Sequence, residues 1–166
     1  MIILGIDPGT QNLGYGIIKK DSSKIQILEA GVIKFKDRDL QNSIKTFPDE
    51  FENILKNWSV DEVAMETIFF SKNPQSIIKL AQFRGALLLF FLKNFQKISE
   101  YSPLEIKKAL TGDGKSTKKQ VNFMVKRVLN IKTEIKPLDI SDALAVAITH
   151  SQRVQISNSQ KTKGLK

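Results

Sequence analysis

Short apolar segments separated by turn residues open the chain and predict three strands. Residues 2–6 form a continuous apolar run that stops at Asp7-Pro8-Gly9, which is typical of a buried strand followed by a turn. A second strand is predicted over 14–20. From 24 to 36 several apolar residues share one parity, which indicates a half-buried third strand. Because only short turns separate these strands, we expect an antiparallel meander.

Helical and strand patterns alternate through the rest of the chain. The spacing of apolar residues predicts helices over 47–55, 76–95, 103–110, 117–129 and 139–152, and strands over 63–66 and 96–101. Pro48 is compatible with the first helix only in its first turn or at a kink. This order predicts an α/β protein with a mixed five-stranded sheet and helices on both faces.

Composition limits the class of protein. The 166 residues fit one domain, which we place at 1–152, and the polar, basic segment 153–166 is expected to be a disordered tail. The absence of cysteine excludes disulfides, thiolate zinc sites and cysteine nucleophiles, and fits a reducing compartment. No basic segment precedes the first apolar run, and Lys79, Gln82 and Arg84 interrupt the most apolar stretch. We therefore expect a cytoplasmic protein with no membrane span.

Charge gives the first indication of a partner. The chain carries 26 Lys and Arg against 17 Asp and Glu, a net charge of +9, and such a field favours polyanions, most often nucleic acid. The excess is uneven, because residues 107–127 contain seven basic side chains and a single acid. Many basic proteins bind no nucleic acid, so this concentration of charge carries more weight than the total.

Four acidic residues stand where they can form a metal site. Asp7 and Glu66 each end a predicted strand, and side chains beyond the carboxyl ends of strands in an open α/β sheet can meet across a crevice. Asp139 and Asp142 are three residues apart at the start of a predicted helix, hence on one face. Four gathered carboxylates need a cation to offset their repulsion. Oxygen ligands without His or Cys select Mg²⁺ or Mn²⁺ over zinc.

Each acid also has a purely structural interpretation. Asp7 precedes Pro-Gly and suits a turn, and Glu66 alone is weak evidence. Asp139 can cap the following helix with Asp142 completing the pair, and an acid in a first turn also suits the helix dipole. The capping and metal-binding roles are compatible, so the residues themselves predict a candidate acidic site and leave its function open.

Four segments resemble, in order and spacing, the motifs of RuvC-type crossover junction endodeoxyribonucleases, the bacterial Holliday junction resolvases. The first is 5–16, GIDPGTQNLGYG, and the second is 66–69, ETIF, with Lys72-Asn73-Pro74 after it. The third is the glycine and lysine segment 111–121, and the fourth is the acidic helix 139–150. The resemblance covers residues 2–152, and the four motifs together are highly specific.

The resemblance implies an RNase H-like fold, a homodimer, and an enzyme that makes paired symmetric nicks in four-way junction DNA during recombination and repair. It implies two Mg²⁺ ions per active site, for which Mn²⁺ can substitute, held by Asp7, Glu66, Asp139 and Asp142. One ion would activate a water and the other would stabilise the leaving oxygen, which leaves a 5′-phosphate and a 3′-hydroxyl. A branch-migration helicase complex is the protein partner that the resemblance suggests.

Basic and aromatic residues of the matching motifs are expected to meet DNA. By resemblance Lys107 and Lys118 lie near the DNA backbone, where a lysine can stabilise developing negative charge. General electrostatic binding is expected of Lys108, Lys115 and Lys119. Phe69 is the aromatic expected to stack on a base near the crossover, a contact worth about 1 to 3 kcal/mol. Its alternative is a core position, and Phe70 beside it leaves open which of the two reaches the DNA.

Two further features have more than one interpretation. His150, the single histidine, lies eight residues after Asp142, about 12 Å along a helix, so a structural or helix-capping role is favoured over metal binding. The helix over 76–95 can cover the sheet with one face and a second subunit with another, which suits the symmetry of a junction. The alternative is a helix buried within a single subunit.

Three other functions share part of this pattern. A related RNase H-like nuclease acting on ribosomal RNA precursors has a similar opening motif, but it lacks a match to residues 111–118 and is usually shorter. A sugar-kinase or chaperone-type ATPase has a phosphate-binding turn like residues 7–10, but such folds close two domains around a nucleotide. A non-catalytic junction-binding module is disfavoured, because acids on a DNA-binding surface oppose phosphates unless metal is present.

Overall fold

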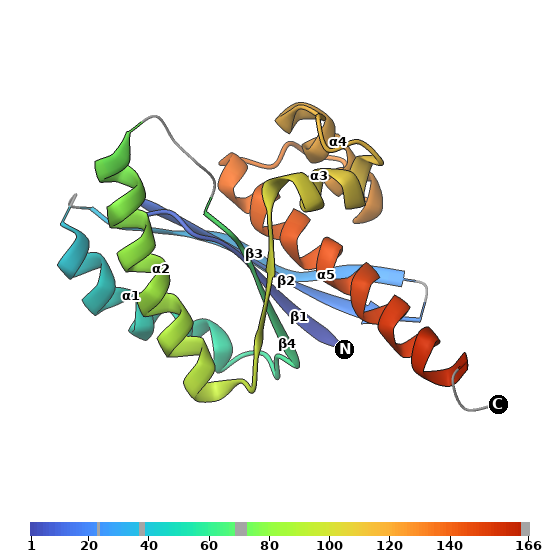
Figure 1. Ribbon diagram of the computed structural model, residues 1–166, viewed down its shortest axis with the longest axis horizontal. Helices are drawn as coiled ribbons and strands as arrows, with labels where there is room; N and C mark the ends of the chain where they lie inside the picture. The colour runs from blue at the N-terminus through green and yellow to red at the C-terminus, as the bar shows by residue number, and fades with distance from the viewer. Residues whose placement is uncertain (23, 37–38, 69–72, 164–166) are drawn as a thin grey trace.

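The computed structural model describes residues 1–22, 24–36, 39–68 and 73–163, and its elements follow the order expected from the sequence (Figure 1). The strands are β1 (Ile2–Asp7), β2 (Asn12–Asp21), β3 (Lys24–Lys34), β4 (Glu62–Glu66) and β5 (Ile98–Tyr101). The helices are α1 (Leu40–Leu55), α2 (Pro74–Asn94), α3 (Pro103–Thr111), α4 (Lys118–Val128) and α5 (Leu138–Lys163).

The five strands form one mixed sheet in the order β3-β2-β1-β4-β5. β1, β2 and β3 pair antiparallel, as the predicted meander requires, and β4 and β5 continue the sheet parallel to β1. Ile6 lies opposite Met65 in this register, so β1 and β4 finish side by side at the same end of the sheet. The predicted five-stranded mixed sheet is confirmed, and it makes neighbours of two strand ends that carry acids.

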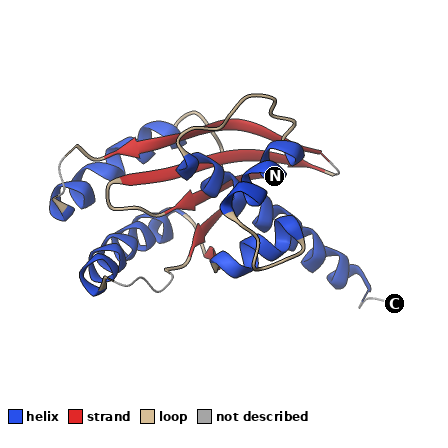
Figure 2. Cartoon of the chain, turned by 90° about the horizontal axis from the view of Figure 1, so that it is seen from above, coloured by secondary structure: helices blue, strands red, loops and turns tan. Residues whose placement is uncertain are grey.

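Helices cover both faces of the sheet and divide the core in two (Figures 1 and 2). α1 and α2 pack on one face, where Phe47, Phe51 and Phe91 are buried against the strands. α5 crosses the other face with α3 and α4 beside it, and this second core includes Val121 and Ile148. The expectation of helices on both faces is therefore confirmed.

α5 lies close against β1 and β2 because glycines in those strands leave room for its backbone. A Cβ atom at Gly5 would lie 2.3 Å from the carbonyl oxygen of Ala143, and one at Gly14 would lie 2.3 Å from that of Asp139. These separations are shorter than any real Cβ contact, so only glycine permits so close an approach. Gly14 also pairs with Asp7 across the β1–β2 ladder. The start of α5 is thereby held beside the carboxyl end of β1.

α1 begins earlier than the apolar spacing predicted. Asp39 caps the helix by accepting a hydrogen bond from the backbone N–H of Gln41, and Pro48 lies in the helix interior rather than in the first turn. A proline there costs about 3 kcal/mol. Phe47 and Phe51 are buried on either side of it, and their packing against the sheet offsets that cost. Tertiary contacts therefore override a local signal that indicated a later start.

α5 extends beyond the predicted end at Gln152. Its backbone is helical to Lys163, where a disordered tail was expected from residue 153. Residues 153–163 contain neither proline nor glycine, so helical hydrogen bonding meets no break before Gly164. The predicted helix boundary is therefore wrong, whereas the division into a domain over 1–152 and a basic tail stays a prediction.

α2 is long and apolar enough to cross a membrane by length and composition alone. However, Phe83, Leu87 and Phe91 of this helix belong to the core beneath α1 and α2. Arg84 forms an ion pair with Glu100 of β5. These contacts are typical of a helix that packs on a sheet, whereas the expectation of no membrane span stays a prediction.

Candidate active site

Two carboxylates stand at the ends of neighbouring parallel strands. Asp7 is the last residue of β1 and Glu66 is the last residue of β4. Their side chains are partly buried and share a hydrogen bond. The meeting of strand-end acids follows directly from the parallel pairing of β1 with β4.

α5 supplies two further acids. Asp139 lies in the first turn, inside a helix that begins at Leu138, so it does not occupy the N-cap position considered for it. Asp142 follows one turn later on the same face. Its carboxylate accepts a hydrogen bond from Lys118 Nζ at 2.9 Å, which ties the start of α5 to the start of α4.

A cleft of about 220 Å³ joins these groups. Its polar walls are Asp7, Glu66 and Asp142, together with Lys107 from α3 and Lys118 from α4. Its apolar walls are Pro103, Ile106, Val121 and Ala145. Asp139 lies outside this lining, yet its charge helps to raise the pKa of Asp7. The fold thus gathers three of the four predicted acids around one cleft and keeps the fourth within electrostatic range.

Burial and mutual repulsion oppose charge on the strand-end acids. Burial first, and then the Glu66 and Asp142 carboxylates, raise the pKa of Asp7 from 3.8 to about 9. Burial likewise raises the pKa of Glu66, although the Lys118 and Lys107 amines oppose that shift. The hydrogen bond to Asp142 raises the pKa of Lys118 and so keeps its amine charged. At neutral pH the Asp7–Glu66 pair therefore retains a proton, which reduces the repulsion between the carboxylates. A bound cation would reduce that repulsion in the same way.

The donor set fits a hard divalent cation. All four side chains offer carboxylate oxygens, which Mg²⁺ prefers. Among the described residues, no group of three or more His, Cys, Asp or Glu side chains is gathered tightly enough to enclose an ion. Lys118 engages Asp142, and Asp7 is hydrogen-bonded to Glu66. A cation bound here would replace Lys118 at Asp142 and the proton at Asp7, since metal ligands must be deprotonated.

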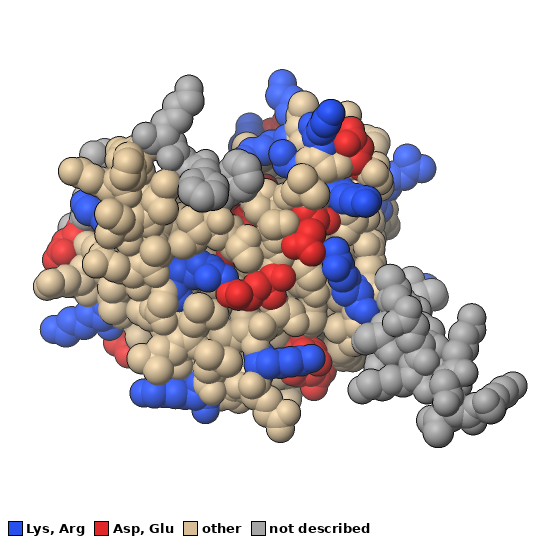
Figure 3. Space-filling model, in the orientation of Figure 1, with Lys and Arg blue, Asp and Glu red and all other residues tan. Residues whose placement is uncertain are grey.

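The predicted basic residues fall into two groups. Lys107 and Lys118 line the cleft. Lys108, Lys115 and Lys119 are exposed and lie outside the lining of the cleft. Figure 3 shows basic side chains gathered over α3 and α4, with acidic side chains nearer the middle of the same face. Phe69 and Phe70 lie outside the described residues, so which of them meets DNA stays a prediction.

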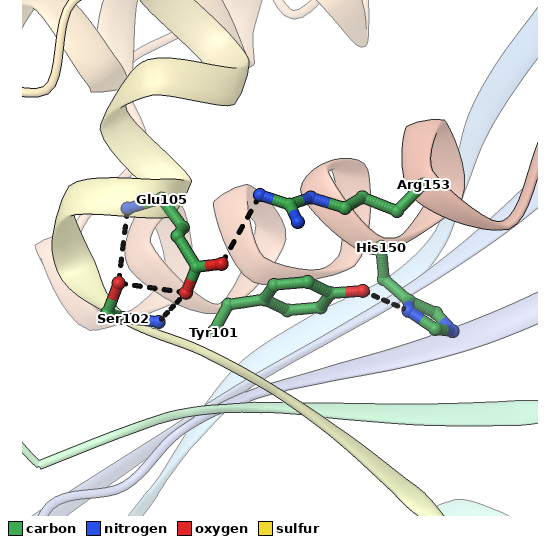
Figure 4. Close-up of polar contacts among 5 residues, drawn as sticks. All are labelled: Tyr101, Ser102, Glu105, His150 and Arg153. Carbon is green, nitrogen blue, oxygen red and sulfur yellow. Dashed lines mark hydrogen bonds and ion pairs between the residues drawn. The ribbon is translucent and has the colours of Figure 1, made fainter. Parts of the chain in front are cut away.

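A polar cluster fixes α3, the helix that carries Lys107, against α5 (Figure 4). Ser102 and Glu105 form a capping box, in which the Ser102 hydroxyl accepts from the Glu105 N–H and the Glu105 carboxylate accepts from the Ser102 N–H at 2.9 Å. Arg153 of α5 forms an ion pair with Glu105 at 3.3 Å. Its guanidinium also lies 5.5 Å from the centre of the Tyr101 ring. These contacts orient α3 over the cleft.

His150 is buried in the contact between α5 and β5. Its Nδ1 shares a hydrogen bond of 2.8 Å with the Tyr101 hydroxyl (Figure 4). Its Nε2 lies 3.5 Å from a carboxylate oxygen of Glu62. Burial lowers the pKa of His150, although Glu62 opposes that shift. This placement supports the structural role, whereas capping of a helix end is wrong because α5 continues beyond it.

Sequence reasoning did not identify Arg84 as part of this region. Its side chain reaches from α2 to the end of β4, where Nε donates to the Glu66 carbonyl oxygen at 3.2 Å. It also lines a second hollow together with Asp7 and Glu66. An arginine within the apolar part of a helix is the signal that could have marked it, because such a charge needs a specific partner.

Comparison with known proteins identifies close relatives over nearly the whole chain. The family model described as crossover junction endodeoxyribonuclease RuvC matches residues 3–150. The RuvC protein of Helicobacter hepaticus is 55% identical, and the match covers 99% of this chain and 90% of that protein. The RuvC protein of Wolinella succinogenes is 57% identical, with 94% of this chain and 97% of that protein covered.

Solved structures support the same relationship. The Thermus thermophilus RuvC structure superposes with a TM-score of 0.82 at 28% identity, covering 95% of this chain and 97% of that one. A second structure shows T. thermophilus RuvC in complex with Holliday junction substrate, with a TM-score of 0.82, 26% identity and coverage of 94% and 96%. The RNase H-like fold that the motifs implied is thereby confirmed. With these matches and its strand-end acids, the chain belongs to the RuvC family of crossover junction endodeoxyribonucleases.

Proposed function

We propose that the chain is a structure-selective DNA endonuclease that resolves four-way junctions by paired symmetric nicks, using two Mg²⁺ ions per active site. The observation that carries this proposal is the cleft in which Asp7, Glu66 and Asp142 face Lys107 and Lys118. A structural relative of high similarity is described in complex with a Holliday junction. Family membership and the site chemistry therefore support the same activity.

The chain's own residues divide the work of cutting. The residues that would hold the ions are the strand-end acids Asp7 and Glu66 and the α5 acids Asp139 and Asp142. Two bound ions would supply the charge that activates a water and stabilises the leaving 3′ oxygen. Lys118 is bonded to Asp142 in the structure; with a cation at that carboxylate, Lys118 and Lys107 at the cleft wall would stabilise negative charge that develops on the phosphate. The products carry a 5′-phosphate and a 3′-hydroxyl.

The basic surface over α3 and α4 supplies attraction for the junction arms. Lys108, Lys115 and Lys119 are exposed there and can neutralise phosphates without reading sequence. The proposed division is therefore between lysines that line the cleft and act on the scissile phosphate, and lysines outside the cleft that hold the duplex. Phe69 is proposed to stack on a base near the crossover.

A two-fold dimer through α2 would present two such clefts to one junction. Ile78, Leu89 and Leu92 are exposed at 57%, 62% and 50%, although the opposite face of α2 is packed on the sheet. The spacings of 11 and 3 residues put these three side chains on one face of the helix. Exposed apolar side chains on one helix face are typical of a protein interface, which favours the dimer over a helix buried within one subunit.

Two further parts of the proposal come from the family resemblance. A branch-migration helicase complex is the proposed protein partner, and the cytoplasm is the proposed location. The absence of cysteine agrees with a reducing compartment. Co-elution of the chain with such a helicase bound to a synthetic junction tests the partner; separate elution of the two would contradict it.

An Asp7→Asn variant tests the role of the acids. Its neutral side chain cannot hold a divalent ion as a carboxylate does, so we expect cutting of a four-way junction to be lost while junction binding in gel shifts is retained. Asp49→Asn is the matched control, because Asp49 is an exposed acid on α1. It should cut normally. Cutting by Asp7→Asn at a near-normal rate would overturn the site assignment.

A further inference from the structure

Arg84 connects α2 to the strand end that carries Glu66. Its side chain is only 13% exposed, and Nε donates to the Glu66 carbonyl oxygen at 3.2 Å. A terminal nitrogen of the same guanidinium forms an ion pair with Glu100 of β5. One arginine thus binds the ends of two parallel strands from a helix that packs across them.

The peptide group between Glu66 and Thr67 is hydrogen-bonded on both sides, and Arg84 provides one of these bonds. The Glu66 carbonyl and the Thr67 N–H belong to the same peptide plane, and the Thr67 N–H donates to the Tyr101 carbonyl at 2.9 Å. Arg84 therefore holds one side of this plane and β5 holds the other. Because the plane is held on both sides, it restrains the backbone at the Glu66 Cα, from which the side chain leaves the strand.

The ion pair with Glu100 does not by itself explain the buried arginine. Glu100 is 40% exposed, and ion pairs with a solvated partner contribute about 0–1 kcal/mol. The pair instead orients the guanidinium so that Nε faces the Glu66 carbonyl, since the planar fork presents its donors in fixed directions. Arg84 also lines a hollow with Asp7 and Glu66, so it lies against the acidic site.

We propose that Arg84 is a positioning residue that orients Glu66 for metal binding and couples the site to α2. The inference rests on the proposed metal site. Residues that hold metal ligands in place typically contribute 10–100-fold to metal affinity. Because the exposed apolar side chains of α2 lie on the same helix, a displacement of α2 would move Arg84 and therefore Glu66.

Direct Mn²⁺ binding to the DNA-free protein, measured by calorimetry, tests the inference with a readout besides activity. Arg84→Met keeps the apolar stem and removes the donors, so we expect Mn²⁺ affinity to fall by about tenfold. Arg84→Lys retains a charge but lacks the fixed fork, and it should recover part of the affinity. Glu100→Gln is the matched control, because it removes the charge of the ion pair but keeps an amide oxygen that can accept from the guanidinium and hold Nε toward Glu66; it should bind Mn²⁺ as the wild type does.

Junction binding without metal and the unfolding temperature separate positioning from folding. For Arg84→Met we expect unchanged metal-free junction affinity and a folded protein, with only Mn²⁺ binding weakened. Wild-type Mn²⁺ affinity in Arg84→Met would overturn the inference and leave the proposed function intact. If Arg84→Met lost Mn²⁺ binding and junction binding equally, and both losses equalled the fraction of unfolded protein, the effect would be on folding alone and the inference would also be overturned. Failure of the wild type to bind Mn²⁺ would instead overturn the proposed function itself.

Discussion

At the scale of single residues, Asp7 shows how burial and like charge prepare a site for cations. Its carboxyl group ends a buried strand, where water is scarce and Glu66 lies within hydrogen-bonding distance. The pKa of about 9 means that the folded protein without metal prefers the protonated form. A divalent ion removes this preference, so metal binding and proton release are linked.

The raised pKa of Asp7 makes metal-free stability fall as pH rises. Between the ordinary pKa of 3.8 and the folded value of about 9, the folded state binds more protons than the unfolded state. The contribution of the protonated group is therefore complete below 3.8 and is lost as pH rises through 9. Asp7→Asn cannot ionise, so it should be more stable than the wild type in urea at pH 8 with a chelator.

The wild type and Asp7→Asn should respond differently to Mg²⁺ in the same urea titration. Added Mg²⁺ should stabilise the wild type through linked binding and leave Asp7→Asn nearly unchanged. At pH 4 the stability difference between them should shrink, because near its ordinary pKa of 3.8 the wild-type carboxyl group also takes up a proton in the unfolded state. A wild type that is the more stable of the two at pH 8 without metal would contradict the proposed electrostatics.

At the scale of elements, two helices bring their functional groups to the cleft by different means. α5 relies on the absence of side chains at Gly5 and Gly14, which lets its backbone touch the sheet. α3 relies on its capping box and on the ion pair between Glu105 and Arg153. Close packing positions Asp142 at the cleft, and capping positions Lys107 there.

Gly14→Ala tests the close approach of α5. The added methyl would meet the Asp139 carbonyl oxygen at 2.3 Å, so the start of α5 must move away from β1. Overpacking of this kind costs about 1–3 kcal/mol, and we expect Mg²⁺-dependent cutting to fall further than the loss of folded protein explains. Thermal unfolding and junction cutting measured on the same sample provide the check. Full activity in a stable variant would show that the contact is dispensable.

Two substitutions at Glu105 separate the cap from the ion pair. Glu105→Gln retains an acceptor for the Ser102 N–H but loses the charge facing Arg153, whereas Glu105→Ala loses both. We expect Ala to lower the free energy of unfolding by about 1 kcal/mol and Gln by less, since both ion-pair partners are well exposed. Hydrogen bonds from Ser102 lower the pKa of Glu105. The stabilising contribution of its carboxylate is thus present above pH 4.5 and is lost as the pH falls. Equal effects of the two substitutions on the free energy of unfolding, measured in denaturant titrations, would contradict this division of roles.

At the scale of the whole molecule, the exposed apolar face of α2 is the surface that we propose a second copy of the chain covers. Replacing Leu89 by Glu puts a charge in the proposed interface, so we expect light scattering to show a monomer where the wild type is a dimer. Ile27→Glu is the control, because Ile27 is also exposed but lies on the edge strand β3, where charges are tolerated. A wild-type monomer at micromolar concentration would contradict the dimer.

The sequence predicted the parts of the fold that depend on local pattern. The strands, their succession along the chain and the acids at the ends of β1 and β4 follow from apolar runs that stop at charged residues; the position of each strand in the sheet does not. The start of α1 was not predictable in this way, because burial of Phe47 and Phe51 stabilises a helix around Pro48. Arg84 and Gly14 were missed for a related reason, since their roles depend on contacts with Glu66 and Asp139, which are distant in sequence.

Mapping of the nicks on a synthetic four-way junction, with and without Mg²⁺, tests the central claim most directly. Each strand is labelled in turn, and the products are separated on a sequencing gel. We expect two nicks at symmetric positions on opposing strands, dependent on Mg²⁺ and absent with Asp7→Asn, and the nicked products should be resealed by ligase. Cutting without a divalent ion, a single unpaired nick, or binding with no nick in the presence of Mg²⁺ would contradict the account.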